Sequence, residues 1–180
     1  MPSLFEKIFT NDEKDTTHVI EREVLLFEEL WGNYPSSTVK HDIDGNGKDF
    51  SDHCAINVSE ALYKCGVKLK SFPKNRKCWG CPTPDSNGKG IHALAAQDLA
   101  SYLQKKPFAL CPDYENIEPE LWEEKIKNRT GIVFYKDYWR RSTDSDDSRT
   151  GDHIDLWNEN KLASLGFWAT FRSNISTTIF

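Results

Sequence analysis

The feature that most constrains the fold is the order in which helix-type and strand-type patterns occur along the chain. Apolar residues recur at three- and four-residue steps over residues 17–31, 53–64 and 91–105, and a shorter helical segment, 119–128, follows. Segments rich in β-branched or aromatic residues come later, at 131–135, 153–158 and 167–172. Helices that precede strands in this way predict an α+β fold with an antiparallel sheet rather than an alternating α/β fold.

The chain of 180 residues has no internal repeat and no Pro/Gly/Ser-rich linker, so we expect residues 1–180 to form one domain. A net charge of −5 gives no electrostatic reason to expect nucleic acid or an anionic membrane as a partner. The longest apolar stretches, such as 24–27, are far shorter than the ~20 residues that cross a bilayer, so no membrane insertion is expected. The N-terminus lacks the apolar core of a secretory signal peptide, which predicts synthesis in the cytoplasm without such a signal.

Cys54 is the candidate nucleophile among five cysteines. It opens the predicted helix at 53–64, and the first turn of a helix stabilises a thiolate through its unpaired N–H groups and partial positive charge. Ser51 or Asp52 is expected to cap this helix, and the Cys54 N–H would face a developing oxyanion. The alternative is that Cys54 is one more small buried residue.

His153 is the candidate base, because acyl transfer by a thiol needs a histidine brought from elsewhere in the chain. It opens a predicted strand in which alternate side chains share a face, so His153 and Asp155 point the same way. The carboxylate would then hold the imidazole in the required tautomer. The alternative is the polar face of an edge strand. Helical geometry points His53 away from its neighbour Cys54, and the other histidines are expected at the surface: His18, His41 and His92.

Two spaced motifs resemble one family. They are Cys54-Ala55-Ile56-Asn57-Val58-Ser59-Glu60-Ala61-Leu62, at the start of a helix, and His153-Ile154-Asp155-Leu156-Trp157-Asn158, on a strand. The upstream segment 31–35 and the Gly90-Ile91 pair fit the same pattern. On these residues the chain resembles the fourth family of type VI secretion amidase effectors.

The resemblance implies a papain-like cysteine peptidase, with the nucleophile at the N-terminus of a helix packed on an antiparallel sheet. It implies a peptidoglycan amidase that cuts between D-glutamate and meso-diaminopimelate. The type VI apparatus would deliver it as an antibacterial toxin to the periplasm of rival bacteria, and a cognate immunity protein would neutralise it. Cys54 and His153 match the family's nucleophile and base. Some members carry an aspartate about eleven residues past the histidine, between two cysteines. This chain has Ser164 there and no cysteine nearby, so strand alternation makes Asp155 the expected third residue.

Two further patterns suggest metals, although neither is complete and no metal or cofactor is expected. Residues 42–47 copy the first half of an EF-hand calcium loop, but position 12 is His53 instead of glutamate. Cys78 and Cys81 have the spacing of half a zinc site, which Cys111 or His92 would have to complete. A disulfide formed after export, or two unpaired thiols, are the alternatives. The competing functions are therefore a calcium- or zinc-loaded adaptor, and a housekeeping or phage cell-wall hydrolase.

Overall fold

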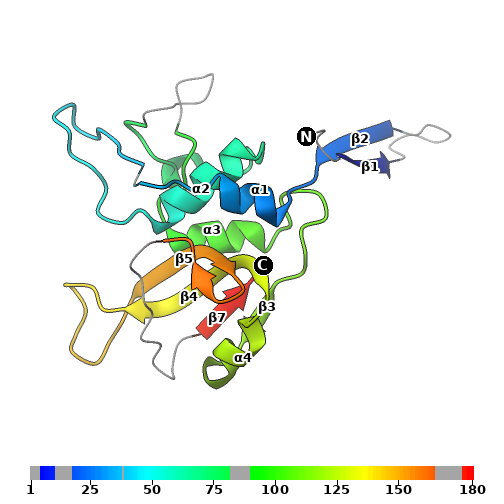
Figure 1. Cartoon of the computed structure of the whole chain (residues 1–180). Coiled ribbons are helices and arrows are strands. Elements are labelled where there is room, and N and C mark those ends of the chain that lie inside the picture. The colour runs from blue at the N-terminus through cyan, green and yellow to red at the C-terminus, as the bar shows by residue number, and fades with distance from the viewer. Residues whose placement is uncertain (1–4, 11–17, 38, 82–89, 165–175) are drawn as a thin grey trace.

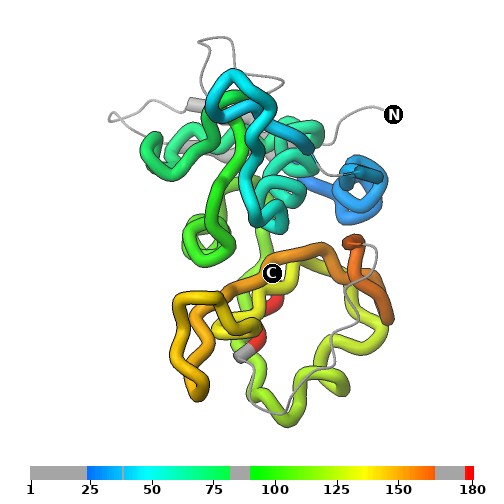
Figure 2. The backbone as a smooth tube through the Cα atoms, turned by 90° about the vertical axis from the view of Figure 1, so that its left-hand side faces the viewer, coloured from blue at the N-terminus to red at the C-terminus, as the bar shows by residue number. Residues whose placement is uncertain are grey.

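A computed structural model describes residues 5–10, 18–37, 39–81, 90–164 and 176–180. Its main body has two layers, which are visible in Figures 1 and 2. The helices α1 (Phe27–Gly32), α2 (Cys54–Lys64) and α3 (Ala96–Leu103) lie over one face of a five-stranded sheet. This is the α+β arrangement that the order of helical and strand patterns predicts.

The sheet has the strand order β3-β7-β4-β5-β6, and each of its strand pairs is antiparallel. The strands are β3 (Glu115–Ile117), β4 (Thr130–Trp139), β5 (Gly151–Asn158), β6 (Lys161–Leu162) and β7 (Ser176–Ile179). The predicted strands at 131–135 and 153–158 are confirmed as parts of β4 and β5, and the one predicted at 167–172 lies outside the described residues. In the β4–β5 register Tyr135 pairs with His153, and Val133 pairs with Asp155.

Two hydrophobic clusters cover opposite faces of the sheet. Ile132, Phe134, Ile154 and Leu156 pack in one cluster with buried residues of α1, α2 and α3. Val133, Tyr135 and Trp157, at the intervening positions, pack in the other with Trp122 and Ile126 of α4 (Trp122–Ile126). Because alternate side chains of a strand share a face, His153 and Asp155 lie on the same face of β5 as Trp157.

The N-terminal region differs from the prediction. Residues 18–23 form β2 (His18–Glu23), which pairs antiparallel with β1 (Phe5–Thr10), and only the last part of the predicted helix at 17–31 is helical, as α1. The helix prediction is therefore wrong for residues 18–23, and residue 17 lies outside the described residues. Pairing with β1 supplies the backbone hydrogen bonds that a helix would otherwise provide, so strand partnership overrides the helical spacing.

The other helices occur where they are predicted, with shorter bounds. The segment 91–95 is extended instead of helical because its backbone is bonded to the 76–78 segment: Cys78 N donates to His92 O at 2.9 Å and Leu94 N to Arg76 O at 3.1 Å. A 3-10 turn, η1 (Lys74–Arg76), begins that partner segment, and another, η2 (Pro119–Leu121), leads into α4. Among the described helices, none has the length and hydropathy needed to cross a bilayer.

A glycine follows the C-terminal end of α2. Gly66 has a φ of +85°, a conformation that favours glycine. Its N–H donates to Tyr63 O at 3.0 Å, and the N–H of Val67 donates to Leu62 O at 2.9 Å. These two bonds form a Schellman motif, which fixes the C-terminal end of the helix that begins at Cys54.

Candidate active site

Cys54 is the first residue of α2, and its side chain is partly exposed. The N-cap is His53, and within the described residues no capping side chain accepts from the first-turn amides. The expectation that Ser51 or Asp52 caps the helix is therefore wrong; both residues are exposed. The first turn keeps its N–H groups and partial positive charge for an anion at Cys54.

Ser59, a buried residue of α2, connects the helix to the rest of the chain. The Ser59 hydroxyl donates to Ala55 O at 2.7 Å and lies 3.0 Å from Ile56 O. The hydroxyl oxygen of Ser59 also accepts the N–H of Ala93 at 3.0 Å, which connects the helix to the segment before α3. Ala55, Ile56 and Val58 are buried in the core, so the start of α2 is held on its inner side while Cys54 stays accessible.

His153 lies on β5 with 8% of its surface exposed. Its ring stacks on Tyr135, at 6.2 Å between centroids and 8° between planes, and Tyr138 lies 5.9 Å away. Burial of the ring opposes its protonation, but its polar contacts with Asp155 and with the Cys54 thiol outweigh this, so the pKa of His153 is raised to about 9. The structure thus brings together the three residues that the sequence selects.

Asp155 is fully buried and lies beside His153, with Oδ2 at 3.7 Å from His153 Nε2. The same oxygen accepts the N–H of Ser164 at 3.1 Å and its hydroxyl at 2.5 Å, while Oδ1 accepts the Leu156 N–H at 2.8 Å. These donors fix a buried carboxylate in one orientation. Ser164 therefore contacts the carboxylate of Asp155 directly.

Tyr34 is a site residue that the sequence reasoning missed as a functional group, although it lies in the 31–35 segment that carries part of the resemblance. Its pKa is raised by burial, by the charge of Asp155 and by a hydrogen bond to that carboxylate, so the phenol stays protonated and donates to Asp155. A hydrogen bond from Asn57 to the phenol acts in the opposite direction. Asn57 lies three residues after Cys54 on α2, so Tyr34 connects the helix to the strand.

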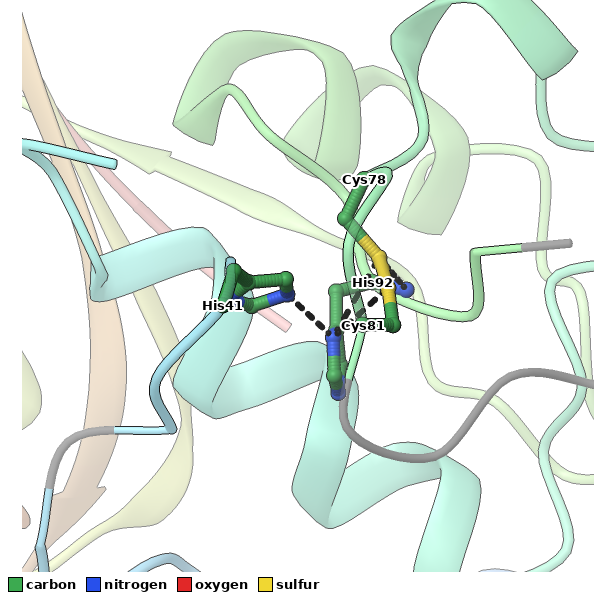
Figure 3. A group of neighbouring side chains, drawn as sticks. All are labelled: His41, Cys78, Cys81 and His92. Atoms are coloured by element: carbon green, nitrogen blue, oxygen red, sulfur yellow. Dashed lines mark hydrogen bonds between the residues drawn. A yellow bond between two sulfur atoms is a disulfide. The ribbon is translucent and has the colours of Figure 1, made fainter. Parts of the chain in front are cut away.

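A second cluster of cysteines and histidines lies beside Glu60 of α2, which contacts His92. Figure 3 shows His41, Cys78, Cys81 and His92 converging on one point, with their ligand-type atoms within 4.8 Å of one another. Cys78 and Cys81 form a disulfide. The expectation that His41 and His92 are surface residues is wrong, because they are 5% and 0% exposed. Cys111, the other suggested partner of the pair, is not a member of this group.

The predicted half of a calcium loop is a turn held by its own carboxylates. Asp44 Oδ1 accepts the N–H groups of Asn46 at 3.0 Å and Lys48 at 3.2 Å, and Asp42 Oδ1 accepts that of Gly47 at 2.9 Å. Gly45 and Gly47 both have positive φ, which explains the glycines at these positions. The carboxylates therefore have a structural role as acceptors within the turn.

The fold is similar to solved structures of Tae4 effectors. The effector Tae4 from Enterobacter cloacae superposes with a TM-score of 0.60 at 14% identity, covering 88% of this chain and 96% of that one. The Tae4 of the Salmonella typhimurium Tae4/Tai4 effector–immunity system superposes with a TM-score of 0.59 at 18% identity, covering 86% and 95%. Its complex with the immunity protein Tai4 from Enterobacter cloacae gives 0.57 at 15% identity, covering 86% and 96%.

The family model for type VI secretion system amidase effector protein 4, Tae4, matches residues 50–180. The chain therefore belongs to the Tae4 family of amidase effectors. Among curated proteins, no sequence matches it. The matched region contains Cys54, His153 and Asp155, whereas Tyr34 and His41 lie before it.

Proposed function

We propose that this chain is a papain-like cysteine amidase of a single domain, residues 1–180, with Cys54 as nucleophile, His153 as base and Asp155 as the residue that orients His153. The observation that carries the proposal is the contact of the His153 ring with both the Cys54 thiol and the Asp155 carboxylate, which raises the pKa of His153 to about 9. An imidazolium at neutral pH beside a thiol favours the thiolate, the reactive form of cysteine.

The arrangement supports a two-step acyl transfer. The Cys54 thiolate attacks the carbonyl carbon, and the Cys54 N–H, at the start of α2, donates to the developing oxyanion. His153 protonates the leaving amine as the C–N bond breaks, which leaves a thioester on Cys54. The neutral imidazole then takes a proton from water, whose oxygen attacks the thioester and releases the acid and the thiol.

Asp155 and Tyr34 act on this reaction through His153. Because Oδ2 of Asp155 lies beside Nε2 of His153, we assign proton exchange with the thiol to the other ring nitrogen, Nδ1. Asp155 stabilises the imidazolium, and Tyr34 and Ser164 hold Asp155 by hydrogen bonds. This division makes Cys54 and His153 the reacting groups and the other three positioning residues.

Family membership favours a bacterial wall substrate for this site. We propose that the bond cleaved is the one between the γ-carbonyl of D-glutamate and the amine of meso-diaminopimelate in peptidoglycan peptides. The type VI apparatus would deliver the protein to the periplasm of target bacteria, where this cleavage is antibacterial. A solved relative forms a complex with the immunity protein Tai4, which supports a cognate immunity protein as a partner here. Membership in an effector family disfavours a housekeeping or phage hydrolase.

Digestion of defined muropeptides tests the proposal. The purified protein should convert a D-glutamyl–meso-diaminopimelate peptide into two fragments, identified by mass spectrometry, one with a new amino terminus on diaminopimelate. Cys54→Ala should give no product, whereas Cys111→Ala, which changes a buried cysteine outside the site, should cleave normally. Product from Cys54→Ala would refute the mechanism, and cleavage at a different bond would refute the substrate assignment.

Expression in Gram-negative cells tests the place of action. Directed to the periplasm, the protein should cause lysis, and Cys54→Ala should not. Expression in the cytoplasm should be harmless because the mature cross-linked wall lies outside it. Killing from the cytoplasm would indicate a different target.

A further inference from the structure

We propose that, in the reduced chain, His41, Cys78, Cys81 and His92 bind one Zn²⁺ ion in a structural site. The four residues come from three segments: the loop before α2, the loop after η1 and the segment before α3. They converge as Figure 3 shows, with His41 facing His92 and both sulfurs beside the same ring. Two thiolates and two imidazoles are a ligand set of structural zinc sites.

The distances from His92 Nδ1 to the other three donor atoms are close to those of a tetrahedral site. His41 Nε2 lies 3.0 Å from His92 Nδ1, and the same Nδ1 lies 3.4 Å from Cys78 Sγ and 3.7 Å from Cys81 Sγ. Around zinc, bonds of roughly 2.0 Å to nitrogen and 2.3 Å to sulfur separate neighbouring ligand atoms by about 3.3–3.8 Å. All four donor atoms lie within 4.8 Å of one another. For zinc to bind, the two sulfurs, which are bonded to each other here, would have to separate.

A carboxylate lies beside the outer nitrogen of each histidine. Glu60 Oε2 lies 2.8 Å from His92 Nε2, and Asp49 Oδ1 lies 3.6 Å from His41 Nδ1. His92 therefore has one nitrogen directed at the cluster and the other bonded to a carboxylate, and the outer nitrogen of His41 lies near a second carboxylate, beyond hydrogen-bond distance. This arrangement recurs around protein-bound zinc, where the carboxylate fixes the tautomer and makes the ligand nitrogen more basic. A plain disulfide needs no such pair of oriented histidines.

The backbone around the sulfurs is also built for close approach. The His92 N–H points at Cys78 Sγ, 3.4 Å away, as in hydrogen bonds that stabilise metal-bound thiolates. Gly80 has a φ of +65°, and a Cβ there would lie 2.1 Å from the carbonyl oxygen of Asp42. A Cβ on Gly90 would lie 1.8 Å from the carbonyl oxygen of Cys78. Glycine at these two positions lets the three segments pack around the four side chains.

The chemistry of the donors selects the metal. Thiolate and imidazole ligands favour zinc over calcium or magnesium, which prefer oxygen. Cys78, His41 and His92 are buried, and four protein ligands leave no open coordination position, so the site is structural rather than catalytic. Glu60 lies on α2, the helix that begins at Cys54, so the ion would fasten the two long loops to the helix of the candidate nucleophile.

The zinc-bound and disulfide forms use the same two sulfurs and exclude each other. A disulfide oxidant such as oxidised glutathione takes two electrons from the two thiolates and, with two protons, becomes two thiols. The Cys78–Cys81 bond forms, the sulfurs lose their charge and the zinc ion leaves. The structure has the disulfide form.

Metal analysis tests the site independently of the amidase proposal, because it is done on Cys54→Ala protein. Purified with reductant and zinc, this protein should contain about one zinc ion per chain by mass spectrometry of the metal. Cobalt in its place should give the visible bands of a tetrahedral site and a thiolate charge-transfer band. Adding Cys78→Ser with Cys81→Ser, or His92→Asn, should abolish both signals, whereas adding Cys111→Ala should leave them unchanged. Reduced protein that binds no zinc, or a double serine variant that keeps it, would overturn the proposal.

Oxidation provides a test that does not depend on a variant folding. Oxidised glutathione should release the zinc from otherwise unchanged protein in step with the loss of two thiols, and reductant with added zinc should restore it. Cobalt should give no charge-transfer band with the oxidised protein. Zinc that stays bound while Cys78 and Cys81 are linked, as shown by peptide mapping, would refute the shared use of the two sulfurs.

Discussion

Two clusters of cysteine and histidine lie beside α2, one at its N-terminus and one next to Glu60. They differ in the number of groups that meet and in how exposed these groups are. At the N-terminal end, one partly exposed cysteine meets one histidine, and a buried carboxylate stands behind that histidine. Around Glu60, two cysteines meet two histidines, and a carboxylate stands behind each histidine. The same residue types thus occur in both places.

The difference teaches that the number of converging donors, more than their identity, separates a nucleophile from a ligand set. A single thiol beside one imidazole can share a proton with it and attack a carbonyl. Two thiols and two imidazoles directed at one point satisfy each other through a disulfide or a metal ion, and neither thiol remains as a nucleophile. Changes at one cluster should therefore leave the other intact.

His153→Gln should have the largest effect in this comparison. Removing the base and proton donor should lower turnover of a muropeptide by about 10³-fold or more, because the thiolate loses its cationic partner. Zinc content of the reduced protein should not change. The measurements are muropeptide turnover and metal content on the same preparation. Loss of zinc together with activity would mean that the two clusters form one unit.

Asp155→Asn should have the next largest effect, a loss of roughly 10- to 1000-fold in turnover. The asparagine keeps the shape but removes the charge that stabilises the imidazolium, and a thiolate–imidazolium pair depends on its third member less than a serine triad does. Asn158, at the end of β5, and Asn160, in the turn after it, provide control substitutions to alanine. Near-normal turnover in Asp155→Asn with a large loss in either control would show that the third residue is elsewhere.

The pH dependence of turnover should report the protonation of His153. On the alkaline side, turnover should fall by about tenfold per pH unit. The imidazolium must protonate the leaving amine, so turnover should hold at neutral pH and fall as pH rises through about 9, where the raised pKa of His153 lies. In Asp155→Asn, which removes one cause of that raised pKa, the fall should begin at lower pH. If turnover of the unaltered protein already falls as pH rises through 6.5, the contacts of His153 with Cys54 and Asp155 do not raise its pKa, and this part of the account is refuted.

Ser164→Ala should have the smallest effect, a loss of two- to tenfold, because Asp155 keeps the bonds from the Ser164 and Leu156 N–H groups. Ser164→Thr, which retains the hydroxyl, should restore turnover. Rescue by threonine separates the hydrogen bond from a general packing defect. Equal losses in both variants would show that the hydroxyl does not position Asp155.

Much of the fold and of the candidate site could be predicted from local pattern. Cys54 at a helix start and His153 and Asp155 on one strand follow from periodicities that the structure keeps, because α2 and β5 are regular and well packed. Gly66 ends α2 by local backbone geometry. Such features depend on neighbours within a few residues, which the sequence contains directly.

The remaining features depend on contacts between distant segments. The strand at 18–23 forms because of pairing with β1, and the burial of His41 results from three segments converging at Cys78 and Cys81. The contact of Tyr34 with Asp155 joins residues 121 positions apart in the sequence. Residue spacing cannot reveal such contacts. The available signals for the second cluster were the Cys78-x-x-Cys81 pair and the histidines His41 and His92.

The alkylation rate of Cys54 is the most direct test of the account. In the unaltered protein, iodoacetamide at pH 7 should modify Cys54 first, as measured by peptide mapping, and activity should disappear in proportion. In His153→Gln, alkylation of Cys54 should be slower by at least about tenfold at the same pH, because the imidazolium no longer favours the thiolate. An equal alkylation rate in the two proteins, or activity that survives full modification of Cys54, would contradict the claim that His153 activates Cys54 as the nucleophile.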